Sequence, residues 1–158
     1  MDWAEVLADP SLQDLPYKVE TNEWGQIVMT PAKNWHARMQ FRVARRLDDL
    51  IPNGEVFGEC SIGTPEGVKV PDVAWASAAF LERNGQVDPY PEAPELCVEV
   101  ISRSNSKRQM ELKSRLYFER GAKEFWICTE KGEVRFFTPD GEVETSLLFP
   151  AFPKSLPQ

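Results

Sequence analysis

The sequence predicts an α/β fold whose sheet contains strands running in both directions. Two segments have the apolar spacing of amphipathic helices, and they alternate with short runs of β-forming residues between Gly- and Pro-rich turns. At 158 residues, 42% hydrophobic and 27% charged, the chain can bury a core without a disulfide or a structural metal. We therefore expect one domain over residues 1–158, with a loose Pro-rich tail at 150–158.

The N-terminal half is predicted to begin with a β-hairpin, because β-forming residues lie on both sides of 21–23 and Pro31 ends the second run. A helix follows, in which apolar residues recur at helical spacing until Pro52-Asn53-Gly54 interrupts them. The predicted elements of this half are hairpin strands 17–20 and 24–29, a helix over 34–51, and strands 55–59 and 68–75.

The C-terminal half contains a helix whose two ends are both marked in the sequence. Ser106 is a suitable N-cap, Gln109 completes a capping box, and Gly121 follows the last turn. Pro139-Asp140-Gly141 predicts a hairpin turn. The predicted elements of this half are the helix 107–120 and strands 96–101, 124–129, 133–138 and 142–149.

Charge and cysteine content restrict the function and the compartment. With 18 Lys and Arg against 25 Asp and Glu, the net charge of −7 argues against a protein that coats nucleic acid without regard to sequence. It does not exclude a nuclease, because a bound cation offsets the charge of an acidic metal site. Cys60, Cys97 and Cys128 show no disulfide or zinc spacing. The first residues lack a basic n-region followed by an apolar h-region, and no segment approaches the length of a transmembrane helix. We expect a cytoplasmic protein without a membrane partner.

Two carboxylates interrupt apolar strand patterns. Glu99 lies within the nearly all-apolar segment 96–101, and Asp72 follows Pro71 among β-forming residues. A buried charge needs a partner, so each position is a candidate for metal binding or catalysis. For Glu99 the alternative is an ordinary ion pair or hydrogen bond. For Asp72 it is a Pro-Asp turn.

The second helix carries a polar stripe on its apolar side. Lys113 lies in the middle of the arc formed by Leu112, Leu116 and Tyr117, and Gln109 and Arg120 fall in the same arc. A single lysine there could bury its stem and extend its amine to solvent. Three polar residues in one stripe favour a site instead.

His36, the only histidine, lies on the inner face of the first helix. A lone histidine in that position is more often part of the core than of a site. Glu20 on the hairpin and Glu59 at a strand end are weaker candidates, because carboxylates at sheet edges are usually solvated.

Two carboxylates brought together from neighbouring strands predict a Mg²⁺ site, with Mn²⁺ as an alternative. Mg²⁺ needs few protein oxygens and no histidine or cysteine cage. It acidifies a bound water and offsets charge at a phosphodiester, while Lys113 could hold that water and Gln109 and His36 could orient water or phosphate. The sequence has no GxGxxG, P-loop, CxxC or Gly-x-Ser-x-Gly motif that would favour another enzyme class.

These residues resemble the PD-(D/E)XK nuclease superfamily, and within it a restriction-endonuclease family first described as a domain of unknown function. The resemblance covers nearly the whole chain and depends on the order of its segments. These are the hairpin with Glu20 and Gly25, Met29-Thr30-Pro31, His36, Val70-Pro71-Asp72-Val73-Ala74-Trp75, Pro94-Glu95-Leu96-Cys97-Val98-Glu99-Val100-Ile101-Ser102, Lys113 with Tyr117, and Gly121-Ala122-Lys123-Glu124-Phe125-Trp126-Ile127.

The resemblance implies a restriction-endonuclease-like fold, with a central mixed β-sheet flanked by helices. Asp72 and Glu99 would bind Mg²⁺, the Val100 carbonyl would contribute, and Glu20 and His36 would support the site. One position departs from the superfamily pattern: two residues after the second acid stands Ile101 and not lysine. Lys113 on the following helix is the expected substitute.

Three hypotheses remain open at this point. The first is a Mg²⁺-dependent endonuclease acting on DNA. The second is a catalytically inactive protein of the same fold that serves as an interaction or nucleic-acid-binding module. The third is a structural homodimer in which the buried acids pair with Lys113 and Arg120. Trp24, Trp35 and Trp126 could belong to a dimer surface, although core packing is the more common use of tryptophan.

Overall fold

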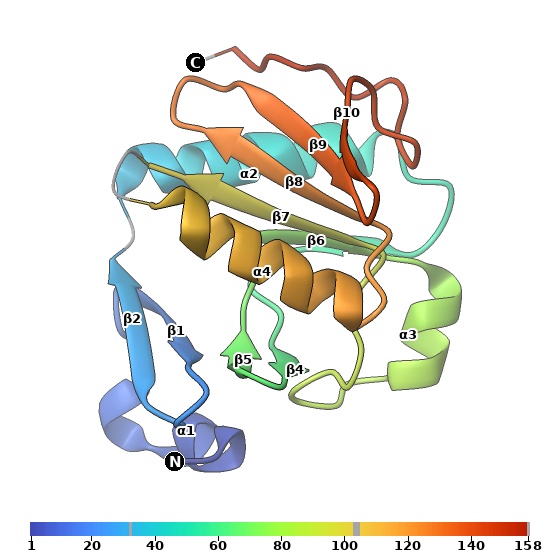
Figure 1. The fold of residues 1–158 in the computed structure, drawn as a ribbon. Coiled ribbons are helices and arrows are strands. Elements are labelled where there is room, and N and C mark those ends of the chain that lie inside the picture. Colours follow the sequence, from blue (N-terminus) through green and yellow to red (C-terminus); the bar gives the residue numbers. More distant parts are fainter. Residues whose placement is uncertain (32, 103–104, 158) are drawn as a thin grey trace.

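The computed structural model describes residues 1–31, 33–102 and 105–157, and Figure 1 shows the arrangement of its helices and strands. The helices are α1 (Trp3–Ala8), the short 3-10 helix η1 (Pro10–Leu12), α2 (Asn34–Asp48), α3 (Ala78–Asn84) and α4 (Lys107–Glu119). The strands are β1 (Tyr17–Thr21), β2 (Ile27–Pro31), β3 (Glu55–Phe57), β4 (Ile62–Thr64), β5 (Gly67–Lys69), β6 (Val73–Ala76), β7 (Leu96–Ile101), β8 (Glu124–Thr129), β9 (Val134–Thr138) and β10 (Gly141–Val143).

A six-stranded mixed sheet forms the centre of the fold, with strand order β10-β9-β8-β7-β6-β3. The β7–β8 pair is parallel, and every other pair in this sheet is antiparallel. Parallel neighbours need a crossover connection, which α4 supplies between β7 and β8. The predicted fold class, a central mixed sheet flanked by helices with an N-terminal hairpin, is confirmed.

The helices α2 and α4 cover opposite faces of the sheet (Figure 1). Side chains alternate between faces along a strand, so each face of β7 packs against a different helix. Leu96, Val98 and Val100 belong to the apolar cluster that contains the buried residues of α2. Cys97 belongs to the cluster that contains Met110 of α4. Glu99 has the parity of Cys97 and therefore faces α4.

The β1–β2 hairpin lies beside the main sheet as a separate two-stranded unit, with α1 at its far end (Figure 1). It is attached through β5, where the Val68 N–H donates to the Thr21 hydroxyl at 2.8 Å. Gly67 permits this close approach: its φ is +95°, and a Cβ there would lie 2.3 Å from the Thr21 carbonyl oxygen. The hairpin is thereby held against the side of the sheet that contains Asp72 and Glu99.

Most of the predicted elements are confirmed, but the strand predicted at 68–75 is wrong. The structure divides it into β5, which pairs with β4, and β6, which joins the main sheet. Pro71 lies at the division, because it has no N–H to donate to a ladder. Two short helices, α1 and α3, are missing from the sequence prediction, since six or seven residues show too little periodicity.

The C-terminal segment packs against the core, and the predicted loose tail is wrong for residues 150–157. Phe152 and Leu156 are each only 3% exposed. The Val134 N–H donates to the Lys154 carbonyl at 2.8 Å, and the Leu156 N–H donates to the Gly132 carbonyl at 2.7 Å. The predicted strand 142–149 is also shorter than expected, because β10 ends at Val143.

In the part of the chain that the structure describes, no helix combines the length and the apolar character that crossing a bilayer requires.

Candidate active site

Asp72 directly precedes β6, and Glu99 lies on β7, the strand that pairs antiparallel with β6. Val73 pairs with Val98, and the Asp72 N–H also donates to the Val98 carbonyl, at 3.0 Å. Asp72 is therefore held against β7, close to Glu99. Both residues are almost fully buried, with exposures of 1% and 2%. Like charges opposite each other destabilise a sheet, so this pair requires compensating cations.

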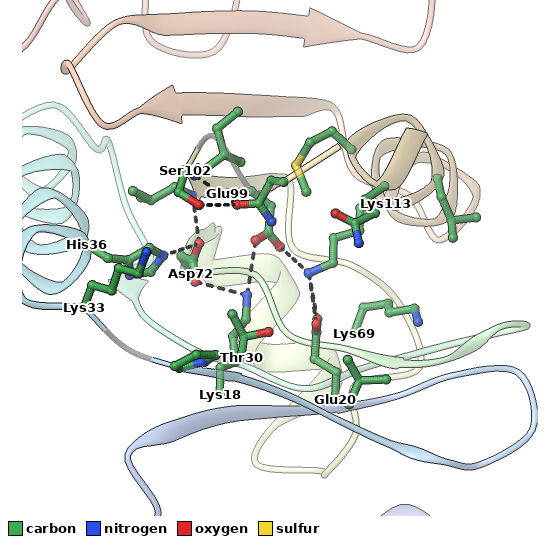
Figure 2. A pocket seen from close by; sticks show the side chains of 18 of the residues that line it. Lys18, Glu20, Thr30, Lys33, His36, Lys69, Asp72, Glu99, Ser102 and Lys113 are labelled. Atoms are coloured by element: carbon green, nitrogen blue, oxygen red, sulfur yellow. Dashed lines mark hydrogen bonds and ion pairs between the residues drawn. The ribbon is translucent and has the colours of Figure 1, made fainter. Parts of the chain in front are cut away.

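Lys18 on β1 lies between the two carboxylates (Figure 2). Its Nζ is 3.1 Å from Asp72 Oδ1 and 3.2 Å from Glu99 Oε2. The side chain is only 11% exposed, so this ammonium is largely removed from water. One cation therefore bridges both acids.

Lys113 on α4 approaches Glu99 from a different side than Lys18 (Figure 2). Its Nζ donates to Glu99 Oε1 at 3.2 Å and to Glu20 Oε2 at 2.9 Å. The Tyr117 hydroxyl, one turn further along α4, donates to the same Glu99 oxygen at 3.0 Å. The inward direction predicted for Lys113 from helical spacing is confirmed, and both oxygens of Glu99 are satisfied.

The second oxygen of Asp72 is held from the sheet and from α2. Asp72 Oδ2 accepts the Val100 N–H at 2.7 Å and lies 3.3 Å from His36 Nε2. Glu20 connects the hairpin to the same cluster, because its Oε2 accepts the Val70 N–H at 2.6 Å in addition to its contact with Lys113. Side chains from five parts of the chain thus form one network.

The network borders a pocket of about 340 Å³, open to solvent. A second pocket of about 460 Å³ adjoins it on the side of α2 and β3. Lys18, His36 and Asp72 line both pockets. Asp72 is therefore buried in the protein yet reachable from two sides, and Glu99 is reachable from the first pocket.

The charges in the network shift the pKa values of its acids in different directions. Burial opposes the ionisation of Asp72, but the hydrogen bond from His36 and the charge of Lys18 outweigh it and lower the Asp72 pKa. Burial also opposes the ionisation of Glu20, and Lys113 and Lys18 lower its pKa nonetheless. For the most deeply buried acid, Glu99, burial dominates and raises the pKa, with Asp72 and Glu20 adding repulsion.

The basic groups respond to the same charges. The hydrogen bond to Asp72 raises the pKa of His36 against the effect of burial. Burial disfavours the charged form of Lys18, but Glu99 and Asp72 outweigh it and raise the Lys18 pKa. Lys69 contacts no carboxylate among the residues that the structure describes, and burial lowers its pKa. Its amine donates instead to the Thr21 carbonyl at 2.9 Å.

The structure brings together most of the residues that the sequence singled out. Asp72, Glu99, Lys113, Glu20 and His36 all line the first pocket. The sequence predicted that the side chains at positions 72, 99 and 113 meet in one accessible pocket, and the structure shows that they do.

Three other candidates lie at the edge of the site or outside it. Gln109 is exposed on the pocket rim, and its side-chain oxygen accepts the Ser106 N–H in the capping box, so its role in orienting water stays a prediction. Glu59 is exposed, has a φ of +58° and borders only the second pocket. Arg120 is the C-cap of α4 and is not among the residues that line either pocket.

Sequence reasoning missed Lys18. The signal was its spacing of two from Glu20 on the same strand, which places both side chains on one face of the hairpin. Nothing in the local pattern distinguishes such a lysine from one on a solvated edge.

The donor set of the site suits Mg²⁺. Across residues 1–31, 33–102 and 105–157, no group of three or more His, Cys, Asp and Glu side chains is arranged to hold a metal. Two carboxylates are sufficient for Mg²⁺, which keeps several waters. The cation of Lys18 is already within 3.2 Å of an oxygen of each acid, so a positive centre fits between them. Coordination by the Val100 carbonyl stays a prediction.

The fold and the site define a restriction-endonuclease-like α/β protein with a lysine-lined acidic pocket. The family described as "Putative restriction endonuclease" (Uma2) matches residues 10–156, and the chain belongs to this family. It is also similar to a solved structure from Anabaena variabilis, described as a putative nuclease belonging to DUF820. That match covers 91% of this chain and 83% of the other, with a TM-score of 0.70 and 17% identity, and it shows the fold. No curated protein sequence matches the chain.

Proposed function

We propose that this protein is a Mg²⁺-dependent endonuclease that hydrolyses phosphodiester bonds in DNA. The observation that supports this most directly is the convergence of Asp72, Glu99 and Lys113, from three separate elements, on one solvent-accessible pocket. Membership of a restriction-endonuclease family agrees with this chemistry.

Asp72 and Glu99 would hold the metal, with an oxygen of each directed to the position between them. A bound Mg²⁺ supplies an acidified water and offsets the charge that develops on the phosphoryl oxygens. The Val100 N–H, 2.7 Å from Asp72 Oδ2, and the Tyr117 hydroxyl, 3.0 Å from Glu99 Oε1, keep the two carboxylates in place. Such fixed orientation is required for precise placement of the reacting groups.

Lys113 is the residue that we assign to the attacking water. It lies 3.2 Å from Glu99 and borders the open pocket, so its ammonium can donate both to a water beside Glu99 and to a phosphoryl oxygen. Glu20, 2.9 Å away, holds the amine in this direction. His36 holds Asp72 from the other side and can orient a phosphate on the rim.

Cleavage of supercoiled plasmid DNA tests the proposal. The protein should nick the plasmid with Mg²⁺ or Mn²⁺ and be inactive with EDTA, and Asp72→Asn, Glu99→Gln and Lys113→Met should each reduce the rate by about 100-fold or more. Glu124→Gln is the matched control for Glu99→Gln, because Glu124 is equally buried on the neighbouring strand but borders neither pocket. Rates are corrected for the folded fraction of each variant.

Two results would contradict the proposal. One is an inert wild-type protein across DNA substrates with either metal. The other is an equal loss in Glu99→Gln and Glu124→Gln, which would mean that the effect is general destabilisation. If the protein cleaves RNA and not DNA, the proposed site chemistry stands and the proposed substrate is wrong.

We also propose that the protein forms a homodimer. Light scattering of the purified protein measures its mass in solution and tests this.

A further inference from the structure

Lys18 is in the position that a metal bridging the two acids would take. Its Nζ is the one group that contacts both Asp72 and Glu99 directly among the described residues. Lys113 contacts Glu99 and Glu20 but not Asp72, and His36 contacts Asp72 but not Glu99. Without Lys18, the two carboxylates would face each other with no shared counter-charge.

The charge balance of the network argues that Lys18 and a divalent cation exclude each other. The directly contacting groups are three carboxylates and two lysines, which leaves one negative charge when His36 is neutral. A divalent cation added beside Lys18 would give a net positive cluster, with the two cations only a few ångströms apart. Because the site is largely shielded from water, two cations at that separation repel each other strongly. With Lys18 displaced, the same cation makes the cluster neutral.

The structure also provides a place for the displaced amine. Lys18 lines the second pocket as well as the first, so its side chain can turn away from the acids into that pocket without displacing core residues. Its strand belongs to the two-stranded hairpin and not to the main sheet. The four-carbon stem of lysine has the rotational freedom for this movement.

We propose that Lys18 is a resident cation that holds Asp72 and Glu99 together in the metal-free protein and that a divalent metal must displace. Lys18 is thus a positioning residue that opposes metal binding and keeps the empty site assembled. The inference rests on the proposed metal site and adds to it the group with which the metal competes.

The first test compares metal affinities by calorimetry, using Mn²⁺ and Mg²⁺ with the wild type and two variants. Lys18→Met removes the competing charge and keeps the length of the stem, so it should bind either metal about tenfold more tightly or better. Lys33→Met is the control, because Lys33 lines the same pocket but is exposed to solvent. Screening by water should limit its effect to about twofold.

The second test uses the wild type alone and therefore does not depend on the folding of a variant. An acetylating reagent is applied with EDTA or with Mn²⁺, and each lysine is quantified by mass spectrometry. Lys18 should be protected with EDTA and become several-fold more reactive with Mn²⁺. Lys107, whose side chain is 91% exposed, should react equally in both conditions and serves as the internal reference.

The outcomes separate this inference from the proposed function. Metal binding that is equal or weaker in Lys18→Met overturns the displacement and leaves the metal site standing. If Lys18 stays protected from acetylation in the metal-saturated wild type, the displacement is likewise overturned and the metal site still stands. If neither the wild type nor Lys18→Met binds metal, the inference and the metal dependence of the proposed function both fall.

Discussion

Replacing Lys113 by methionine tests whether the acids of the pocket depend on this lysine. The substitution keeps an unbranched side chain of similar length, so little packing is lost. It removes the ammonium that lies 2.9 Å from Glu20 and 3.2 Å from Glu99, both of them buried. Removing one partner of a buried ion pair costs about 3–5 kcal/mol, because the other charge remains buried without compensation. Lys18 still contacts Glu99, so we expect a loss near the lower end of that range.

The matched control is Lys107→Met on the same helix. The Lys107 side chain is 91% exposed and forms only an i,i+4 pair with Glu111 at 3.9 Å. Such a pair contributes about 0.5 kcal/mol or less. Urea unfolding followed by tryptophan fluorescence measures both variants. With a slope of about 2 kcal/mol per molar urea, Lys113→Met should lower the midpoint by about 1.5 M or more, while Lys107→Met leaves it nearly unchanged. Equal midpoints for the two variants would refute the assigned ion pairs.

Three further predictions concern the contact that docks the hairpin, the buried Glu124 and the buried thiols. Gly67→Ala should cost about 1–3 kcal/mol and reduce nicking, because its Cβ would lie 2.3 Å from the Thr21 carbonyl and would shift the hairpin that carries Lys18. Glu124→Ala should cost about 3 kcal/mol in urea unfolding, since it leaves two buried donors and one part-buried donor unpaired. Burial raises the pKa values of Cys60 and Cys128 to about 12, so thiol reagents at pH 8 should modify them only after unfolding. The unfolded chain loses these thiol protons first as the pH rises, so the two cysteines should lower stability above about pH 9.

Each of these predictions has a result that would contradict it. Gly141 also has a positive φ, +127°, but a Cβ there meets nothing within 4 Å, so Gly141→Ala reproduces the backbone strain without the clash. Equal losses in the two glycine variants would show that the contact with Thr21 is not required. An unchanged urea midpoint for Glu124→Ala would mean that its donors find other partners. Rapid native labelling of Cys60 or Cys128 would show that they are accessible thiols.

The elements that could be predicted from the sequence are those with a long periodic pattern of apolar residues or with capping residues at their ends. The helix beginning at Lys107 was delimited by Ser106 and Gln109, because a capping box fixes a helix start by local hydrogen bonds. Glu99 and Lys113 could be recognised because a polar residue on an otherwise apolar face is rare. The division of segment 68–75 into two strands could not be recognised, because the pairing of β5 with β4 depends on contacts distant in sequence.

The features that the sequence analysis missed also depend on contacts between residues that are distant in sequence. Lys18 was missed because its role depends on where the hairpin docks, and the close approach of Gly67 to Thr21 decides that docking. The packed tail was missed because prolines suppress the local pattern of segment 150–157. Phe152 and Leu156 are nevertheless apolar enough to fill the core on the α2 side of the sheet.

A comparison of two glutamates shows which features separate a site from a structural acid. Glu99 and Glu124 lie on the parallel strands β7 and β8 and are 2% and 1% exposed, so burial does not distinguish them. The donors to Glu124 are the Trp126 indole, the Ser146 hydroxyl and the Leu148 N–H, all neutral groups that join the C-terminal segment to the sheet. Glu99 is held instead by two lysines and a tyrosine, beside a second carboxylate and an open pocket. Cationic partners are exchangeable for another cation, and the pocket gives that cation a route to both acids. The kind of charge that compensates a buried acid, together with its access to solvent, therefore supports the role proposed for Glu99 and distinguishes it from Glu124, whose partners are all neutral.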